Sequence, residues 1–152
     1  VKSYIIKKML DLLNSKIDKY LLQLDANCKL TFDEYFEEKI INEKGFECSY
    51  FNFSSGERRT IDISVMFAFM EIQKILGKFE TNVEFYDELI DSSLDERGVN
   101  CVLEILKERS TQKGIYLITH RKEIDSIVSG EIIWLRKENG LTSRTILTKN
   151  NK

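Results

Sequence analysis

The sequence has 152 residues, of which 42% are hydrophobic and 32% charged, and its 23 basic and 25 acidic side chains give a net charge of −2. This composition supports a folded domain of ordinary size, and it excludes intrinsic disorder and a wholesale basic nucleic-acid binder. No apolar run approaches the roughly 18 residues of a membrane-spanning helix, so no membrane partner is expected. Three widely spaced cysteines predict reduced thiols in a cytoplasmic protein, and not a disulfide framework or a zinc site.

Residues 1–24 predict an amphipathic helix. Their apolar residues alternate spacings of four and three, as a coiled-coil seam does: Ile6, Leu10, Leu13, Ile17, Tyr20 and Leu24. Fewer than three heptads are present, and a helix packed on its own domain has the same spacing. The spacing therefore leaves both structures open.

Residues 28–53 change to a β pattern, with two strands expected at 37–42 and 46–51. The next segment, 56–77, predicts a helix that is apolar on all sides in its middle and is therefore buried in a core. Gly77 is suited to end this helix.

The second half alternates strands and helices. A strand–helix–strand order implies a parallel sheet with helices on its faces, and hence an α/β fold. Asn139-Gly140 is a strong turn signal for a final hairpin. The expected segments are a strand at 82–86, a helix at 94–109, a strand at 114–119, a short helix at 121–128, and hairpin strands at 131–136 and 142–148.

The stretch from Phe53 to Arg59 opens the buried helix with small residues. Such a helix start presents free N–H groups and the positive end of the helix dipole, which suits a phosphate. Either Ser54 or Ser55 can cap the helix. An ordinary N-cap before a core helix explains the same residues, so this stretch alone is not specific.

A mostly apolar strand ends in Asp87 and Glu88. Carboxylates at the C-terminal end of a strand project into the ligand crevice of an α/β sheet. An aspartate there can hold Mg²⁺ through water, and an adjacent glutamate can activate an attacking water. A solvated acidic loop is the alternative. Glu84, inside this strand, predicts either an edge strand or a polar partner.

Two more stretches follow in the chain. Ser93, Leu94 and Asp95 come soon after the two carboxylates, where a helix N-cap explains them equally well. His120 is the only histidine and ends the second apolar strand. An imidazole there can reach a phosphate, although a lone histidine is more often structural or simply exposed.

The order of these four stretches resembles the C-terminal half of an ATP-binding-cassette (ABC) ATPase head, over about residues 25–148. The resemblance implies an α/β lobe that contributes to an ATP site. The matching residues are Ser54, Ser55, Gly56 and Glu57 for the signature motif, Asp87 and Glu88 for the end of Walker B, Ser93, Leu94 and Asp95 for the D-loop, and His120 for the switch histidine.

Among the ABC ATPases, the heptad pattern of the first helix favours the SMC, SbcC and break-repair families. In these families the two halves of the head are separated in sequence by a long coiled coil. Within that family the chain is most similar to the ATPase subunits of T-even-phage recombination endonucleases. The resemblance divides the chain into the end of a coiled-coil helix, 1–24, and an ATPase lobe, 25–152. Ser55 departs from the usual signature glycine, and Leu89 stands where many relatives carry proline.

The resemblance also implies a role for each motif. Asp87 would organise Mg²⁺ through water, Glu88 would be the catalytic general base, and His120 would be a catalytic residue that senses or stabilises the γ-phosphate. The signature residues Ser54 and Gly56 would instead contact ATP bound to the opposite protomer. Asp95 would also reach across that dimer.

One part of an ATP site is missing from the sequence. There is no G-x-x-x-x-G-K-[ST] loop to hold the β- and γ-phosphates. In the family this loop lies in the N-terminal half of the head, and a chain that starts at Val1 within a helix is expected to continue upstream. We therefore expect an ATP hydrolase that acts only when joined to that half, with this segment inactive alone.

The implied function is the ATPase lobe of a DNA recombination and repair exonuclease complex. Its implied partners are its own N-terminal half, a second copy, an Mre-type nuclease and double-stranded DNA, in the host cytoplasm if the protein is from a phage. The alternatives are a chromosome-organising SMC-type ATPase with a kleisin partner, and a non-catalytic dimerisation or DNA-docking module. Candidate DNA contacts are Lys2, Lys7, Lys8, Arg58 and Arg59, and for each of the lysines a solvated surface position is the simpler explanation.

Overall fold

The structure is a computed structural model that describes residues 2–77, 81–91, 93–128 and 130–148. The chain forms two compact units, Val1–Thr119 and His120–Lys152. Among the described residues, no helix combines the length and apolar character that crossing a membrane requires. The first unit contains α1 (Lys2–Gln23), β1 (Cys28–Phe32), β2 (Glu38–Asn42), β3 (Glu47–Cys48), η1 (Tyr50–Asn52), α2 (Ser55–Ile75), β4 (Val83–Asp87), α3 (Glu96–Ser110) and β5 (Gly114–Ile118).

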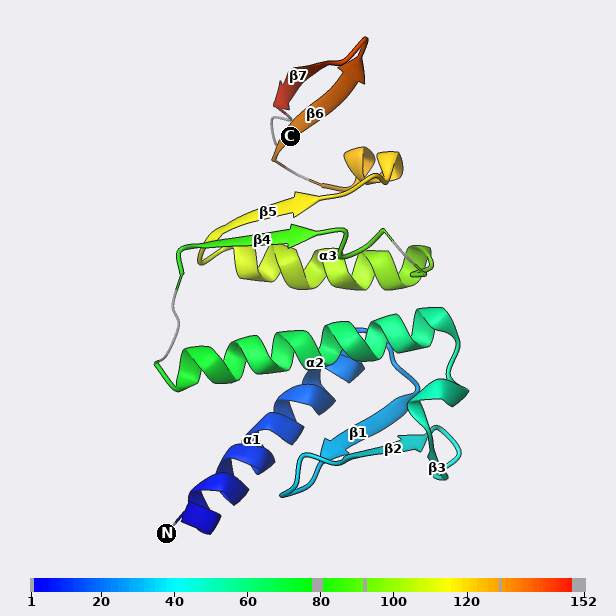
Figure 1. Ribbon diagram of the computed structural model, residues 1–152, viewed down its shortest axis with the longest axis vertical. Coiled ribbons are helices and arrows are strands. Elements are labelled where there is room, and N and C mark those ends of the chain that lie inside the picture. The colour runs from blue at the N-terminus through cyan, green and yellow to red at the C-terminus, as the bar shows by residue number, and fades with distance from the viewer. Residues whose placement is uncertain (1, 78–80, 92, 129, 149–152) are drawn as a thin grey trace. The chain divides into compact units, whose positions relative to one another are not determined.

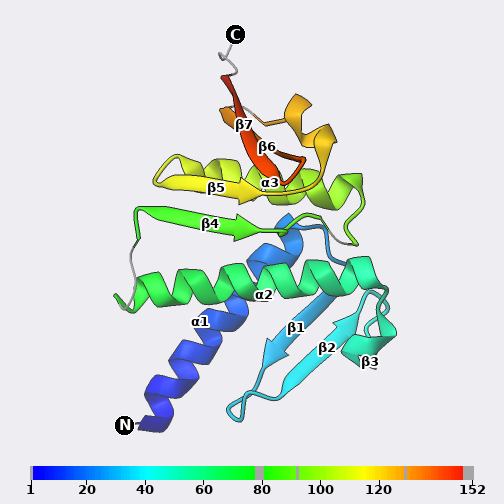
Figure 2. The same cartoon turned by 45° about the horizontal axis from the view of Figure 1, so that its top comes forward.

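Helix α2 lies in the middle of the first unit (Figures 1 and 2), with α1 and the strands β1–β3 on one side and β4, β5 and α3 on the other. Phe67 of α2 is fully buried, and its ring contacts Tyr20 of α1 and Tyr86 of β4 at centroid distances of 5.3 and 5.9 Å. The helix is less uniformly buried than its sequence predicts, because Phe69 remains 38% exposed.

The first helix is packed on its own unit along part of its length, which is one of the two structures that its spacing left open. Its C-terminal part packs on the unit, where Leu13, Ile17 and Tyr20 are buried. Near its N-terminus, Ile5 and Ile6 are 52% and 44% exposed. The apolar stripe therefore continues beyond the part of the helix that the unit covers.

Strands β1, β2 and β3 form an antiparallel sheet in that order. The third strand is shorter than the sequence predicts, because Ser49 and Asn52 form a capping box that starts the 3₁₀ helix η1. The expected strand at 46–51 is therefore wrong in its second half.

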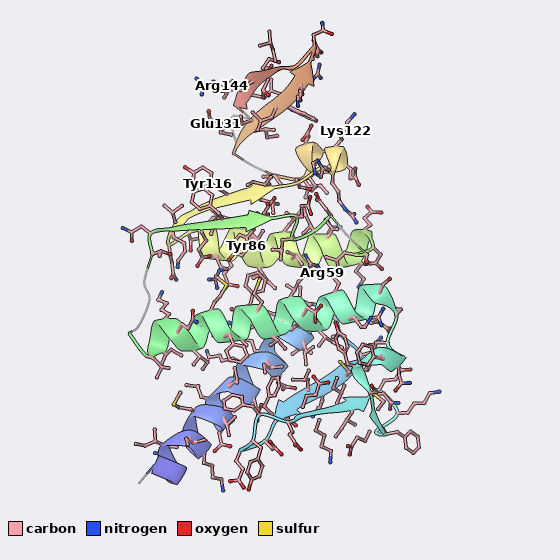
Figure 3. All side chains as sticks on the ribbon, viewed as in Figure 1. Arg59, Tyr86, Tyr116, Lys122, Glu131 and Arg144 are labelled. Atoms are coloured by element: carbon pink, nitrogen blue, oxygen red, sulfur yellow. The ribbon has the colours of Figure 1, made fainter. Side chains whose placement is uncertain are left out.

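Strands β4 and β5 form the predicted parallel pair, with Asp87 opposite Ile118. Tyr86 lies on the face toward α2, whereas Tyr116 projects from the other face (Figure 3), stacked on Phe85 with ring centroids 4.9 Å apart. Phe85 is 69% exposed. The predicted α/β fold with a parallel sheet is confirmed, but the helices of this unit cover one face of the pair and not both.

The second unit contains η2 (Lys122–Ser126), β6 (Glu131–Glu138) and β7 (Leu141–Thr148). The expected helix at 121–128 is a shorter 3₁₀ helix. The predicted hairpin is confirmed, and its strands extend to the turn at Asn139 and Gly140. Both turn residues have positive φ, 50° and 81°, which matches the right-handed twist of a hairpin.

Glu84 has the polar partner that its place in an apolar strand predicted. Its carboxylate is buried and accepts hydrogen bonds from Arg109 at 2.6 and 2.9 Å, from Lys113 at 2.8 Å and from the Tyr86 hydroxyl at 2.7 Å. These bonds join β4 to the end of α3. The hydrogen bonds and the two cations compensate the buried negative charge of Glu84. Removing the carboxylate would leave the Arg109 and Lys113 cations partly buried without their anionic partner.

The cluster determines the pKa of Glu84. Burial raises the pKa, but the bonds from Arg109, Lys113 and Tyr86 outweigh burial and lower the pKa from 4.5 to about 2. A carboxyl whose pKa is lower in the folded state stabilises the fold above its unfolded pKa. That contribution is lost as the pH falls from 4.5 toward 2.

We therefore expect Glu84→Gln to destabilise the protein at pH 7, with a deficit that shrinks by about 3 kcal/mol between pH 5 and pH 2. Urea unfolding of both proteins across this range measures the deficit. The matched control is Glu104→Gln on the exposed side of α3, which is expected to follow the wild type. A deficit for Glu84→Gln that stays constant with pH would contradict this assignment.

Candidate functional site

The predicted phosphate-binding stretch forms the start of α2. Ser54 is the N-cap: its hydroxyl accepts from the Glu57 N–H at 3.3 Å, and its own N–H donates to the Glu57 carboxylate at 2.8 Å. Hydrogen bonding to Ser54 lowers the pKa of Glu57. This reciprocal capping box fixes the direction of the helix start and leaves Ser55 exposed in the first turn.

Gly56 brings this helix start against the D-loop stretch. A Cβ atom built on Gly56 would lie 2.8 Å from the backbone carbonyl oxygen of Ser93. A side chain at residue 56 therefore requires the Ser93 backbone to move. Ser93 itself has a positive φ of 62°, so the D-loop stretch is already turned into an uncommon conformation at this contact.

The two predicted catalytic carboxylates follow one another at the end of β4. Asp87 is the last residue of the strand and is exposed. The Glu88 N–H continues the ladder by donating to the Ile118 carbonyl at 3.0 Å, and Glu88 then turns the chain with φ of 51°. Leu89 and Ile90 are buried and hold the turn to the unit.

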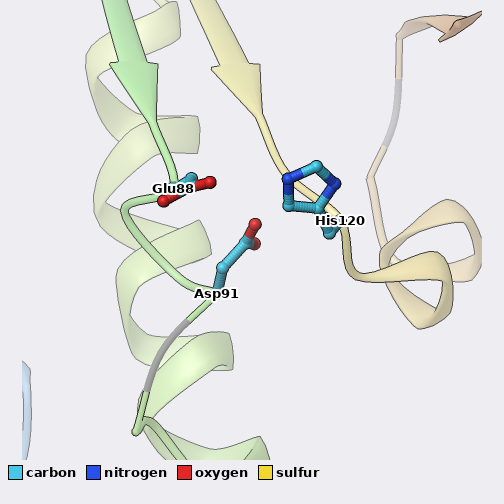
Figure 4. A group of neighbouring side chains, drawn as sticks. All are labelled: Glu88, Asp91 and His120. Atoms are coloured by element: carbon cyan, nitrogen blue, oxygen red, sulfur yellow. The ribbon is translucent and has the colours of Figure 1, made fainter.

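Figure 4 shows Glu88 and Asp91 on the turn after β4, and His120 after β5. The Asp91 carboxylate accepts a hydrogen bond from the Thr119 hydroxyl, which ties this turn to the end of β5. His120 is the first residue of the second unit and comes two residues after Ile118, the β5 residue that bonds to Glu88.

The predicted D-loop residues lie directly before α3. Leu94 is buried, and Asp95 is the N-cap, whose carboxylate accepts from the Gly98 N–H at 2.7 Å. The helix expected from residue 94 thus begins at Glu96. The cap leaves Asp95 exposed, with one carboxylate oxygen engaged in its own chain.

Arg59 belongs to this site, although its sequence pattern did not indicate a contact with the turn after β4. The sequence suggested only that Arg59 could contact DNA, whereas in the structure its guanidinium donates to the backbone carbonyls of Glu88 and Leu89, each at 3.1 Å. The sequence does carry a signal for this inward position: residue 59 is spaced by four from Ile63 and Phe67, which lie on the buried side of α2.

The other candidate DNA contacts differ among themselves. Arg58 lies over the Tyr50 ring, 5.9 Å from its centroid, and is half-buried. Lys7 and Lys8 are exposed on α1, and the side chain of Lys2 lies outside the described residues.

Comparisons with known proteins identify relatives of the chain. No protein-family model matches it. The exonuclease subunit 2 proteins of Escherichia phage RB69 and Enterobacteria phage T4 are 32% and 31% identical to it, over 96% and 93% of its length. The chain is homologous to phage exonuclease subunit 2. It spans about a quarter of the length of these curated relatives, 26% and 25%.

Solved structures give the same fold. A structure from work on ATP-driven dimerization and DNA-stimulated activation of SMC ATPases has a TM-score of 0.77 at 15% identity, covering 97% of this chain and 90% of that one. The SMC head domain from Thermotoga maritima has a TM-score of 0.65 at 20% identity, covering 95% of this chain and 51% of that one.

An Smc head bound to the C-terminal winged-helix domain of ScpA has a TM-score of 0.70 at 20% identity, covering 91% of this chain and 43% of that one. At such identities the likeness concerns the fold. The predicted resemblance to phage exonuclease subunits and SMC-type heads is confirmed, as is the fold class of the lobe. The division at residue 24 and the coiled-coil stub stay predictions.

We expect Gly56→Ala to lower the free energy of unfolding by about 1–3 kcal/mol, because the new methyl group overlaps the Ser93 carbonyl. Alanine normally favours a helix over glycine, so a loss runs against intrinsic propensity. Urea unfolding measures the change.

Gly98→Ala in the first turn of α3 is the matched control. The three atoms nearest to its new methyl group are side-chain atoms of Asp95 and Leu94, the closest at 3.2 Å, and none of them is a backbone atom. Because these side chains can shift, the free energy is expected to stay within about 0.5 kcal/mol of the wild type. Equal effects of the two variants would contradict a specific contact between Gly56 and Ser93.

Proposed function

We propose that this chain is the C-terminal lobe of an ATP-hydrolysing head that controls a partner nuclease on DNA ends in a recombination and repair exonuclease complex. The observation that carries the proposal is the end of β4, where Asp87 and Glu88 leave a parallel strand pair beside the start of α2 and the D-loop stretch. Homology to phage exonuclease subunit 2 supports the nuclease complex.

The residues at this strand end fit magnesium and ATP. Asp87 is an exposed carboxylate at the C-terminal end of a parallel strand, and Mg²⁺ prefers such oxygen ligands, often through water. When bound, ATP would supply the phosphoryl group, and Mg²⁺ would neutralise part of the negative charge of the phosphates. Glu88 accepts the proton of the attacking water, and its backbone bond to Ile118 keeps it beside the end of β5.

A complete site needs other polypeptide segments. The cradle for the β- and γ-phosphates comes from the N-terminal half of the head, since the sequence of this chain contains no such loop. His120 senses the γ-phosphate in that site. Ser54, Gly56 and Asp95 contact the nucleotide of a second copy, so that hydrolysis depends on dimerisation of the heads.

Residues 1–24 form the end of a coiled coil in this proposal. The exposed apolar residues near the start of α1 support it, because Ile5, Ile6 and Met9 continue the stripe outside the packed region. A second helix along this stripe would cover them. Opening and closing of the heads would then move the coil, the bound nuclease and double-stranded DNA.

Glu88→Gln in the full-length protein tests the catalytic assignment. The amide keeps the shape of the side chain but cannot accept the proton, so ATP turnover is expected to fall by about 100-fold or more. ATP-bound dimers should accumulate, as measured by size-exclusion chromatography with ATP and Mg²⁺.

Glu104→Gln on the exposed side of α3 is the control and is expected to keep wild-type turnover. Unchanged turnover in Glu88→Gln would refute the general-base role. It would also favour the alternative of a non-catalytic dimerisation or DNA-docking module, which has no need of this carboxylate.

The partner distinguishes the proposal from a chromosome-organising SMC-type ATPase. We expect the full-length protein to retain an Mre-type nuclease subunit in a pull-down and not to retain a kleisin. Deleting the exposed segment of α1 should abolish capture if the nuclease binds at the base of the coil. Capture of a kleisin without a nuclease would support the alternative.

A further inference from the structure

Arg59 links the start of α2 to the turn that carries the proposed general base. Its Nη2 donates to the carbonyls of Glu88 and Leu89, and Figure 3 shows it on the side of α2 that faces this turn. We propose that Arg59 is a positioning residue for ATP hydrolysis, which holds the backbone of Glu88 so that its carboxylate meets the attacking water. The inference rests on the proposed function, since it requires Glu88 to be the base.

The turn at Glu88 needs such a restraint. A residue other than glycine with φ of 51° is strained, and it persists only where its surroundings determine its conformation. The Glu88 N–H is held on one side by the Ile118 carbonyl, and buried Leu89 and Ile90 hold the following residues. Arg59 restrains the remaining side, where both carbonyls of the turn point toward α2.

The side chain of Arg59 is suited to this task. One terminal NH₂ group carries two hydrogens, and it bonds two successive carbonyls. The Arg59 Nε is buried and has no hydrogen-bond partner among the described residues. This nitrogen is therefore desolvated in the conformation that brings Nη2 to the turn. A lysine at this position carries rotatable donors on a flexible stem, whereas the two hydrogens of Nη2 have directions fixed by the planar guanidinium.

The same helix turn carries the signature residues. Gly56 contacts the Ser93 carbonyl one turn before Arg59 contacts the Glu88 carbonyl, so α2 touches both ends of the segment 88–93. Arg59 thus acts through Glu88 and not on the nucleotide itself.

The test measures steady-state ATP hydrolysis by the full-length protein. Arg59→Met keeps an aliphatic side chain and removes the donors, and it is expected to lower kcat by about 10- to 100-fold, because small misplacements of a catalytic group have effects of this size. The KM for ATP should stay within about twofold, since binding is not altered. Arg59→Lys should give an intermediate kcat.

Arg144→Met is the matched control, because it removes an exposed arginine of β7 and should leave kcat and KM unchanged. A wild-type kcat in Arg59→Met would overturn the inference, and so would a loss that appears in KM and not in kcat. If Arg59→Met does not fold, Arg59→Lys decides in its place, and a wild-type kcat there overturns the inference.

Glu88→Gln separates the inference from the function on which it rests. If Glu88→Gln keeps its turnover, the proposed function fails and the positioning role fails with it. If Glu88→Gln abolishes turnover and Arg59→Met keeps full kcat, only the positioning role of Arg59 fails.

Discussion

The first unit depends on the burial of α2 between two layers. Phe67 is the centre of that contact, since its ring touches Tyr20 in the layer of α1 and Tyr86 in the layer of β4. Burying one aromatic ring against two others contributes about 3 kcal/mol or more, as large-to-small substitutions of core aromatics show. The position of the helix start relative to β4 follows from this packing.

Two buried or partly buried carboxylates orient the aromatic residues around Phe67. Glu84 accepts from Tyr86, and Glu71 accepts from Tyr20 while pairing with Lys16 and Lys19. Burial and these carboxylates raise the pKa of both tyrosines, which therefore stay protonated donors. Because a hydrogen bond has a preferred direction, each pair restricts how its ring can turn within the core.

The same packing has a consequence for the site. With α2 held by its centre, its first two turns lie against the segment 88–93, where Gly56 meets Ser93 and Arg59 meets Glu88. The proposed trans contact and the proposed base are therefore both connected to the start of α2 within the unit. Interfaces between packed elements shift between discrete arrangements and do not deform continuously, so under the proposed function this connection would link dimerisation to hydrolysis.

The amino-acid sequence by itself determined the elements and the order of the motifs. Apolar periodicity predicts α1, α2 and the strands, and Asn139-Gly140 predicts the hairpin, because these signals are local properties of the chain. It did not predict the end of β3, where a capping box at Ser49 and Asn52 ends the strand early. Only the tertiary structure decided the contacts of Arg59 and the cationic partners of Glu84, because these partners lie 25 to 30 residues away along the chain.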